Sequence, residues 1–597
     1  MAQLIPTLDQ ARRFKVRPEA GELHLLAFLD QTLGDEYEVY FQPFLNGDRP
    51  DIVVMRKGSG VLIIEVKDWD LSHYSVDSNG NWYVHAGGRH RKKFPVDQVR
   101  TYRRNLFDLH IEHLLERQLE NGKLLATVAC AVYFHRGSQS QLDELCGQVE
   151  YVELLTPDSL TEENFERMLR RTWLSRPSVY FDDNLYKRFH RYLQPPQHTR
   201  DQGKEPIYTS KQKTLSESRP VQQKIRGVAG SGKTKVLARR AVNAHLRTGN
   251  RVLILTYNIT LQNYIHDAIS EIRENFVWDN FYIVNYHQFF NTEANNHDLP
   301  IQSRDYDYED ESFFEPVKGQ ITKFDAVFID EIQDYNSEWI RIVKGYFLRE
   351  GGEFVVFGDE KQNIYHQTLG EDKRPNTTIP GAWNELNDSF RSADPVINLA
   401  FEYQDYFFHN RYDLDEIEVL EQKGLFAEEQ HLRYSFLAPN TPIDEIFTRI
   451  REVVEEWHVH PNDVCVLSPE VEPLRDLDHL FRTVSHERTR TTFECKEQWD
   501  SLQNRENCER DVKRLRKSKK LHFWMNSGTV KLSTIHSFKG WESDTLVVLI
   551  EEGTDAGNPS NDELVYTAIT RCKNNLLILN VGNHRYHDFF EQHVGSN

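Results

Sequence analysis

Gly227-Val-Ala-Gly-Ser-Gly-Lys-Thr234 is the stretch that decides the fold of this chain. It matches the pattern GxxxxGK[ST], and residues 236–246 after it have a helical pattern. In such a loop the backbone N–H groups wrap phosphates at a helix N-terminus, the lysine reaches the outer phosphates and the threonine ligates Mg²⁺. The sequence therefore predicts a site for ATP and Mg²⁺. Its predicted contacts are Gly227, Gly230, Ser231, Gly232, Lys233 and Thr234.

A second acidic stretch, Asp330-Glu-Ile-Gln-Asp334, follows the strand-like residues 326–329. Ligands of open α/β sheets bind at the carboxyl ends of strands, where this stretch lies. We expect Asp330 to hold the Mg²⁺ ion. Glu331 is then placed to polarise the water that attacks the terminal phosphate.

From about residue 206 to 590 the chain resembles superfamily 1 helicases of the UvrD type. Residues 330–334 resemble motif II, with Ile332 where alanine is usual. Four later stretches resemble motifs III to VI in the family's order: Gly358-Asp359-Glu-Lys-Gln362-Asn-Ile-Tyr365, Asn387-Asp-Ser-Phe390-Arg391-Ser392, Thr534-Ile-His536-Ser-Phe-Lys539-Gly540-Trp-Glu542 and Val565-Tyr-Thr-Ala-Ile-Thr570-Arg571. Each stretch alone is a weak signal, and their order and spacing make the resemblance specific.

The resemblance implies roles for residues outside the phosphate loop. Arg391 and Arg571 would neutralise charge on the transferred phosphoryl group, and Gln362 would couple the γ-phosphate to motion. The implied nucleoside contacts are Gln212 and Phe390 with adenine and Glu542 with the ribose.

Five further residues occupy family positions that face the nucleic-acid strand: Tyr257, Asn258, His287, Tyr365 and His536. Stacking of bases on such aromatic side chains tolerates any sequence, which suits a translocating motor. For each of the five, ordinary packing is an open alternative.

The accessory subdomains of the family look reduced or missing. Between motifs Ia and II we find only a short acidic stretch that contains residues 305–311. Most of the residues between motifs IV and V are needed for the second motor domain itself. Translocation or ATP-gated binding is therefore expected, rather than processive unwinding.

A β-hairpin is predicted near the amino terminus, where Asp51-Ile-Val-Val-Met and Val61-Leu-Ile-Ile-Glu65-Val-Lys67 are joined by residues 56–60. Strand alternation puts Glu65 and Lys67 on one face. Asp51 shares that face if the loop has an odd number of residues, and we expect Gly58-Ser59-Gly60, with positive φ at Gly60, to supply it. Two carboxylates and a lysine then converge, as metal-dependent phosphodiester hydrolysis requires.

These residues resemble the PD-(D/E)xK nuclease core, and the surrounding domain resembles the nuclease-related NERD domain. Asp51 and Glu65 would bind Mg²⁺ and Lys67 would position the water. Supporting residues implied by the resemblance are Glu22 on the first helix and Gln98 and Tyr102, which lie one helical turn apart. A domain that binds DNA without cutting it remains the alternative.

The predicted fold class is α/β: two RecA-like parallel-sheet motor domains preceded by a mixed α/β nuclease domain. The expected boundaries are 1–155 for the nuclease-like domain, 156–205 for a helical connector and linker, 206–395 for the first motor domain and 396–597 for the second.

The composition of the chain bears on its cellular compartment and on its surface charge. Six scattered cysteines, with no CxxC pair and no secretory leader, predict a reducing, cytoplasmic compartment, and no apolar run is long enough for a membrane. The net charge of -20 argues against a uniformly basic surface, although basic clusters occur at residues 89–93 and 513–520.

The expected partner is DNA, single-stranded or forked, and the expected activity is a helicase or translocase fused to a nuclease. Fusions of this kind resemble those used in phage defence or DNA repair. One alternative is an ATP-switched nucleic-acid sensor, and another is a motor that acts on RNA.

Overall fold

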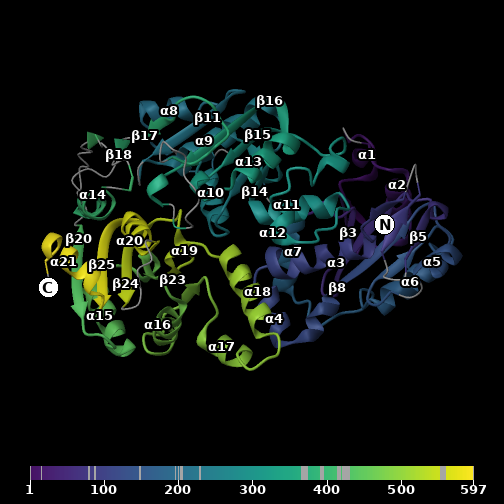
Figure 1. The fold of residues 1–597 in the computed structure, drawn as a ribbon. Helices are drawn as coiled ribbons and strands as arrows, with labels where there is room; N and C mark the ends of the chain where they lie inside the picture. Colours follow the sequence, from purple (N-terminus) through teal and green to yellow (C-terminus); the bar gives the residue numbers. More distant parts are fainter. Residues whose placement is uncertain are drawn as a thin grey trace. The chain divides into compact units, whose positions relative to one another are not determined.

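The computed structural model describes residues 2–14, 17–77, 81–85, 89–146, 149–194, 197–199, 201, 203, 206–227, 230–362, 364, 374–386, 388–389, 395–409, 411–412, 418–419, 430–551 and 560–595. The chain is mixed α/β, as predicted (Figure 1). It forms two compact units: Met1–Gln197 with His287–Tyr308, and His198–Tyr286 with Glu309–Asn597. No helix in the described part of the chain has the length and apolar character needed to cross a membrane.

The first unit is built around a six-stranded mixed sheet in the order β1-β2-β3-β4-β8-β9. Its strands are β1 (Gln3–Ile5), β2 (Tyr37–Phe41), β3 (Ile52–Arg56), β4 (Gly60–Lys67), β8 (Val128–Phe134) and β9 (Glu153–Leu155). Alternate residues of β4 point to opposite faces. Val61 and Ile63 pack toward α3 (Pro95–Asn105), and Leu62 and Ile64 pack toward α2 (Ala20–Thr32).

The predicted connector also contributes to this core. Phe165 of α6 (Glu162–Arg171) joins the cluster on the α2 face, and Phe189 of α7 (Asp183–Leu193) joins the cluster on the α3 face. Residues 162–193 are therefore part of the first unit rather than a free connector, because their apolar stripes cover both faces of its sheet.

One segment of the first unit comes from far along the sequence. His287–Tyr308, which the predicted boundaries place in the first motor domain, groups with the first unit. It contains most of α11 (Tyr286–Asn296) and all of α12 (Arg304–Asp307). The short acidic stretch predicted between motifs Ia and II is thus preceded by an inserted helix that belongs to the nuclease-like unit.

The second unit contains two six-stranded sheets whose strand pairs are all parallel. The first has the order β14-β12-β15-β16-β11-β17. Its strands are β11 (Gln222–Gly227), β12 (Val252–Thr256), β14 (Phe281–Asn285), β15 (Phe324–Ile329), β16 (Leu348–Gly358) and β17 (Asn384–Leu386). The helices α9 (Lys233–Thr248) and α10 (Leu261–Ser270) pack on one face through aliphatic side chains.

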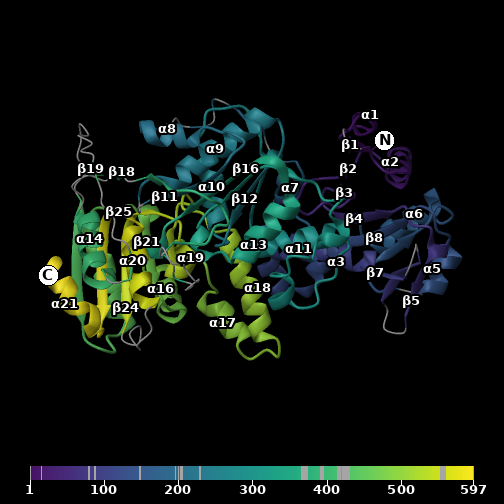
Figure 2. The ribbon, with the colours of Figure 1, turned by 45° about the horizontal axis from the view of Figure 1, so that its top comes forward.

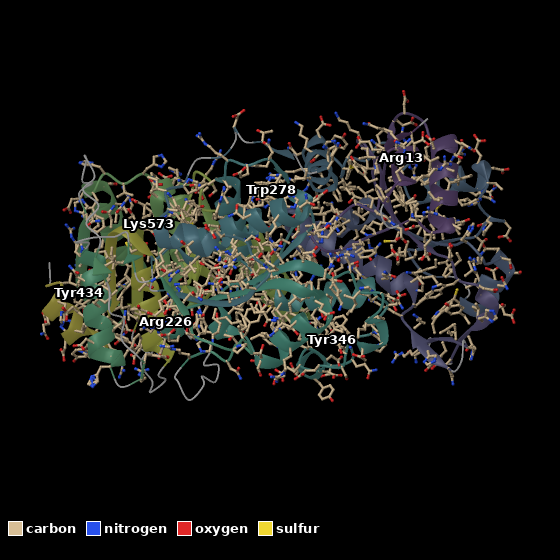
Figure 3. All side chains as sticks on the ribbon, turned by 90° about the horizontal axis from the view of Figure 1, so that it is seen from above. Arg13, Arg226, Trp278, Tyr346, Tyr434 and Lys573 are labelled. Carbon is tan, nitrogen blue, oxygen red and sulfur yellow. The ribbon has the colours of Figure 1, made fainter. Side chains whose placement is uncertain are left out.

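The second sheet has the order β20-β25-β24-β21-β23-β22. Its strands are β20 (His431–Leu437), β21 (Val464–Ser468), β22 (Thr489–Thr491), β23 (Val530–Thr534), β24 (Ser543–Glu551) and β25 (Cys572–Val581). One face packs on α14 (Pro395–Phe408), α20 (Ser560–Thr570) and α21 (His584–His593) (Figure 2). The other packs on α15 (Ile443–Glu456) and α16 (Val471–Thr483) (Figure 1). On the first face the hydroxyl of Tyr434 lies 2.9 Å from His587 Nδ1 (Tyr434 is labelled in Figure 3). Helices on both faces explain the almost continuous apolar strands.

Candidate functional sites

The phosphate loop joins β11 to α9 in the predicted order of strand, loop and helix. Gly230 and Gly232 have φ values of +76° and +80°, which a side chain disfavours. A Cβ atom at Gly227 would lie 2.4 Å from Ser231 Oγ. Lys233 Nζ donates to the Gly227 carbonyl at 2.6 Å and lies 3.7 Å from Asp359 Oδ2. The three glycines therefore have a steric reason to be glycine.

The acidic stretch lies at the carboxyl end of β15, beside the phosphate loop. Thr234 Oγ1 is 3.5 Å from Asp330 Oδ2, so both predicted Mg²⁺ ligands are at one place. Glu331 has a φ of +53°, an uncommon conformation for a residue with a side chain. Burial and the neighbouring Glu331 raise the pKa of Asp330 to about 7, although Lys233 opposes the shift. A divalent cation would stabilise the ionised form of this carboxyl.

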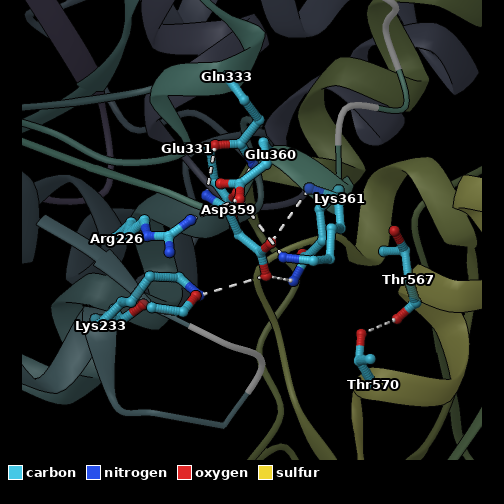
Figure 4. A network of polar contacts seen from close by, with 12 residues as sticks. Arg226, Lys233, Glu331, Gln333, Asp359, Glu360, Lys361, Thr567 and Thr570 are labelled. Carbon is cyan, nitrogen blue, oxygen red and sulfur yellow. Dashed lines mark hydrogen bonds and ion pairs between the residues drawn. The ribbon is translucent and has the colours of Figure 1, made fainter. Parts of the chain in front are cut away.

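Motif III connects the phosphate loop to motif VI (Figure 4). Gln362 is fully buried; its Nε2 donates to Asp359 Oδ2 at 2.8 Å, and its Oε1 accepts from Arg571 Nη2 at 2.8 Å. Burial alone would raise the pKa of Asp359, but Lys233, Lys361 and Arg571 together lower it below its usual value. Gln333 continues the network, because its amide contacts Glu331 and its Oε1 accepts from the Asp359 N–H at 3.1 Å.

A buried ion pair links motif II to motif V. Lys539 Nζ lies 2.7 and 2.9 Å from the two carboxylate oxygens of Asp334, and both side chains are 1% exposed. The ammonium is also 3.9 Å from Glu331 Oε2 and donates to the Gln362 carbonyl. Asp334 and Lys539 lie in the stretches that resemble motifs II and V, but neither residue was predicted to have a role. Their pairing joins residues 205 positions apart, which no local pattern reveals.

Two buried donors at this site have no hydrogen-bond partner within the described residues: Ser231 Oγ and Arg571 Nε. Both lie on motifs that would contact an anion, so the donor set fits a nucleotide phosphate chain with its Mg²⁺ on Thr234 and Asp330.

The nucleoside residues are only partly accounted for. Gln212 is buried in α8 (Ser210–Ser216), and its Nε2 donates to the Ser231 carbonyl at 2.8 Å. Glu542 lies 3.7 Å from Lys573 Nζ. Phe390 and Arg391 lie outside the described residues.

Asn258 and His536, two of the five predicted nucleic-acid residues, lie together at motif V. Asn258 is buried, and its Nδ2 lies 3.0 to 3.1 Å from the carbonyl oxygens of His536, Ser537 and Lys539. These contacts connect the first motor sheet to motif V. Burial, followed by Lys520 and Lys539, lowers the pKa of His536 to about 4, so its ring is neutral near pH 7.

The other residues of this predicted set lie elsewhere. The Tyr257 ring packs 6.3 Å from Tyr335 and Trp339, measured between centroids. His287 is in the first unit, where its ring lies 5.1 Å from that of Tyr308. Tyr365 is outside the described residues.

The predicted amino-terminal hairpin is β3 and β4, with Ile52 opposite Ile64 and Arg56 opposite Gly60. The odd-numbered loop is Lys57-Gly58-Ser59, and its positive φ of +72° is at Gly58, not at Gly60 as predicted. Gly60 starts β4, where a Cβ atom would lie 2.7 Å from the Thr127 carbonyl oxygen. The register nevertheless puts Asp51 opposite Glu65, as expected from an odd loop.

Asp51, Glu65 and Lys67 converge on the α3 face of the sheet. Asp51 Oδ2 accepts from the Val66 N–H at 2.6 Å, and Lys67 Nζ donates to Glu65 Oε1 at 2.9 Å. Burial, Glu65 and Glu22 raise the pKa of Asp51 well above its usual value, and burial raises that of Glu65 to about 7 against the effect of Lys67. Burial would lower the pKa of Lys67, but Glu65 and the other nearby carboxylates raise it.

The supporting residues surround these three. Glu22 of α2 accepts from Gln42 Nε2 at 2.7 Å, and burial raises its pKa. Gln98 Nε2 donates to the Tyr102 hydroxyl at 3.2 Å, one turn further along α3. Both contacts hold polar groups beside the hairpin carboxylates.

The described residues contain no group of three or more His, Cys, Asp or Glu side chains arranged to hold a metal ion. Mg²⁺ in proteins keeps several waters and uses one or two carboxylates, so Asp51 and Glu65 would be enough. Glu65 Oε2 is buried and has no hydrogen-bond partner among the described residues. This free oxygen and the raised pKa values fit a cation between the two carboxyls.

Two known domain families match the regions that contain the two candidate sites. Residues 17–135 match the nuclease-related domain family, NERD, and residues 212–368 match an AAA domain. A search of curated proteins finds no match. The protein thus carries a nuclease-related domain followed by an AAA domain of the type found in helicase-like ATPases.

Proposed function

We propose that this protein is an ATP-driven translocase of the superfamily 1, UvrD-like type, fused to a Mg²⁺-dependent DNA nuclease. The observation that carries the motor half is the contact of Arg571 with Gln362, which joins motif VI to the Asp359 carboxylate of motif III. An arginine that reaches the phosphate site from a second domain is how such motors sense and stabilise the transferred phosphoryl group.

In this mechanism Lys233 and Ser231 would hold the phosphates, while Asp330 and Thr234 would hold a Mg²⁺ ion, which would balance the phosphate charge. Glu331 takes the proton of the attacking water. Arg571 and, by family likeness, Arg391 neutralise charge as the terminal phosphoryl group leaves. Residues 206–395 and 396–597 would be the two motor domains, with Gln212, Phe390 and Glu542 around the nucleoside.

The nuclease half is supported by the convergence of Asp51, Glu65 and Lys67 inside a nuclease-related domain. The two carboxylates would hold Mg²⁺, which supplies charge for the attack on a phosphodiester. The Lys67 ammonium would position the attacking water. Single-stranded or forked DNA is the proposed substrate, and phage defence or DNA repair the proposed setting.

The test is a cleavage assay on single-stranded, double-stranded and forked DNA, with and without ATP and Mg²⁺. We expect Mg²⁺-dependent cutting that Lys67→Ala abolishes, together with DNA-stimulated ATP hydrolysis that Lys233→Ala abolishes. ATP hydrolysis without any cutting would favour the ATP-switched sensor, and stronger competition by RNA than by DNA would favour an RNA-directed motor.

A further inference from the structure

We propose that the segment His287–Tyr308, inserted between β14 and β15 of the motor sequence, contributes a functional residue to the nuclease site. Asp298 is the positioning residue through which it acts, by holding the Lys67 ammonium. This inference rests on the proposed nuclease function. It goes beyond that function, because the nuclease residues predicted from the sequence all lie between positions 22 and 102.

The inserted segment is attached to the nuclease residues by specific polar contacts. The Tyr102 hydroxyl lies 3.1 Å from Asn296 Oδ1, and Asn296 Nδ2 donates to the Gly47 carbonyl at 2.8 Å. One residue earlier, Asn295 Oδ1 accepts from Lys93 Nζ. The carboxyl end of α11 is therefore held on the same helix, α3, that carries the supporting residue Tyr102.

Asp298 lies just beyond that helix end. Its carboxylate Oδ1 is 3.8 Å from Lys67 Nζ, and the two side chains are only 16% and 13% exposed. Its φ of +57° is the left-handed conformation in which helices often end, and the Leu299 N–H donates to the Ala294 carbonyl at 2.8 Å across this turn. The end of α11 therefore fixes the backbone of Asp298 beside Lys67.

The Lys67 ammonium is consequently shared between two carboxylates, Glu65 at 2.9 Å and Asp298 at 3.8 Å. Glu65 uses Oε1 for this pair, whereas its Oε2, on a side chain 3% exposed, has no hydrogen-bond partner in the part of the chain that the structure describes. Without Asp298 the ammonium would be balanced mainly by Glu65, and it would compete more strongly with a metal ion for that carboxylate. Sharing the charge leaves Glu65 Oε2 available to the metal, in the way that outer ligands tune a metal site.

The test compares the full-length wild type with Asp298→Asn, Asp298→Glu and the control Asp305→Asn. Asp305 is an exposed carboxylate in the same inserted segment. Asp298→Asn should lower the cleavage rate about tenfold and raise the half-saturating Mg²⁺ concentration by a similar factor, because outer-ligand changes cost 10- to 100-fold. Asp298→Glu should recover much of the cleavage rate and of the Mg²⁺ affinity. Asp305→Asn should match the wild type in both quantities. Thermal unfolding should be unchanged in all three variants.

Mn²⁺ binding provides a readout that does not depend on cutting. The protein is titrated calorimetrically with Mn²⁺ alone, and the part of the binding heat that Asp51→Asn abolishes is assigned to the nuclease site. Mn²⁺ binding at this site should be weaker in Asp298→Asn than in the wild type. If the wild type never cuts DNA, the proposed function fails, but this titration still tests Asp298. Wild-type Mn²⁺ affinity in Asp298→Asn would overturn the inference, as would cleavage faster than wild type, which would make the segment an inhibitor.

Discussion

The proposed ATP site and the proposed nuclease site gather similar chemical groups in different ways. In the ATP site, Lys539 lies after β23 and Arg571 lies just before β25 of the second sheet, but they contact Asp334 and Gln362, which follow strands of the first. In the nuclease site, Asp51, Glu65 and Lys67 come from a single hairpin. The ATP site therefore depends on two sheets being held together, whereas the hairpin's own register assembles most of the nuclease site.

That difference has a mechanical consequence. Contacts that join two parallel sheets can open and close with nucleotide binding, and a ligand can shift such an equilibrium only by its differential affinity. A hairpin fixed by backbone hydrogen bonds has no comparable alternative arrangement. We expect variants of the ATP site to change both catalysis and domain coupling, and variants of the hairpin to change catalysis alone.

The largest effect is expected at Arg571. Arg571→Ala should lower DNA-stimulated ATP hydrolysis by about 10³-fold or more, since an arginine finger contributes about 10³ to 10⁵ in kcat. Steady-state phosphate release measures it. Arg433→Ala is the matched control, because Arg433 pairs with Glu456 on the surface of the same domain and should leave turnover unchanged. Equal turnover in Arg571→Ala and the control would contradict the assigned role.

Glu331→Gln tests the same site without removing a positive charge. Loss of the base should slow hydrolysis by about 10² to 10⁴-fold while ATP still binds. Binding of a fluorescent ATP analogue and phosphate release, measured on one preparation, separate the two effects. Loss of nucleotide binding instead would make Glu331 a binding residue.

The hairpin variants should have a smaller but cleaner effect. Asp51→Asn, Glu65→Gln and Lys67→Ala should each reduce DNA cleavage by about 10² to 10³-fold, in the range expected for general acid–base groups and for positioning. ATP hydrolysis should stay within about twofold of the wild type, given the local origin of the site. If ATP hydrolysis falls in parallel with cleavage in all three, the two sites are not independent.

The buried pair of Asp334 and Lys539 gives a stability effect. Asp334→Asn should destabilise the second unit by about 3 to 5 kcal/mol, because it removes the carboxylate 2.7 Å from the buried Lys539 ammonium and leaves the more distant one of Glu331, at 3.9 Å. Replacing both residues by apolar ones, Asp334→Leu with Lys539→Met, should recover much of that loss. Urea unfolding followed by circular dichroism compares the variants. A double variant as unstable as the single one would show that the pair is not the cause.

The smallest effect is expected at Asn258. Asn258→Ala removes the hydrogen bonds from its amide to the motif V carbonyls, each of which contributes about 1 kcal/mol. We expect a several-fold loss of DNA stimulation with little change in basal ATP hydrolysis. Asn243→Ala is a suitable control, since its amide donates to Ser216 within the first motor domain. A loss confined to DNA affinity would favour the predicted strand contact over coupling.

The sequence predicted much of the fold and located both candidate sites, because these signals are local. The phosphate loop needs glycines at fixed positions, and Gly230 and Gly232 do have positive φ. Strand alternation and an odd-numbered loop predicted that Asp51 and Glu65 would face each other, although the turn glycine is Gly58. These predictions depend on backbone geometry over a few residues, which a sequence specifies directly.

Tertiary structure alone decided three further features. The helices within residues 162–193 have apolar stripes that could cover any sheet. Their place in the first unit depends on the parts of its sheet faces that other helices do not cover. The pairing of Lys539 with Asp334 joins distant positions without a spacing rule. The placement of Asp298 beside Lys67 requires the chain to leave the first motor sheet and return to it. Periodicity identifies the face of an element that will be buried, but long-range packing selects its partner.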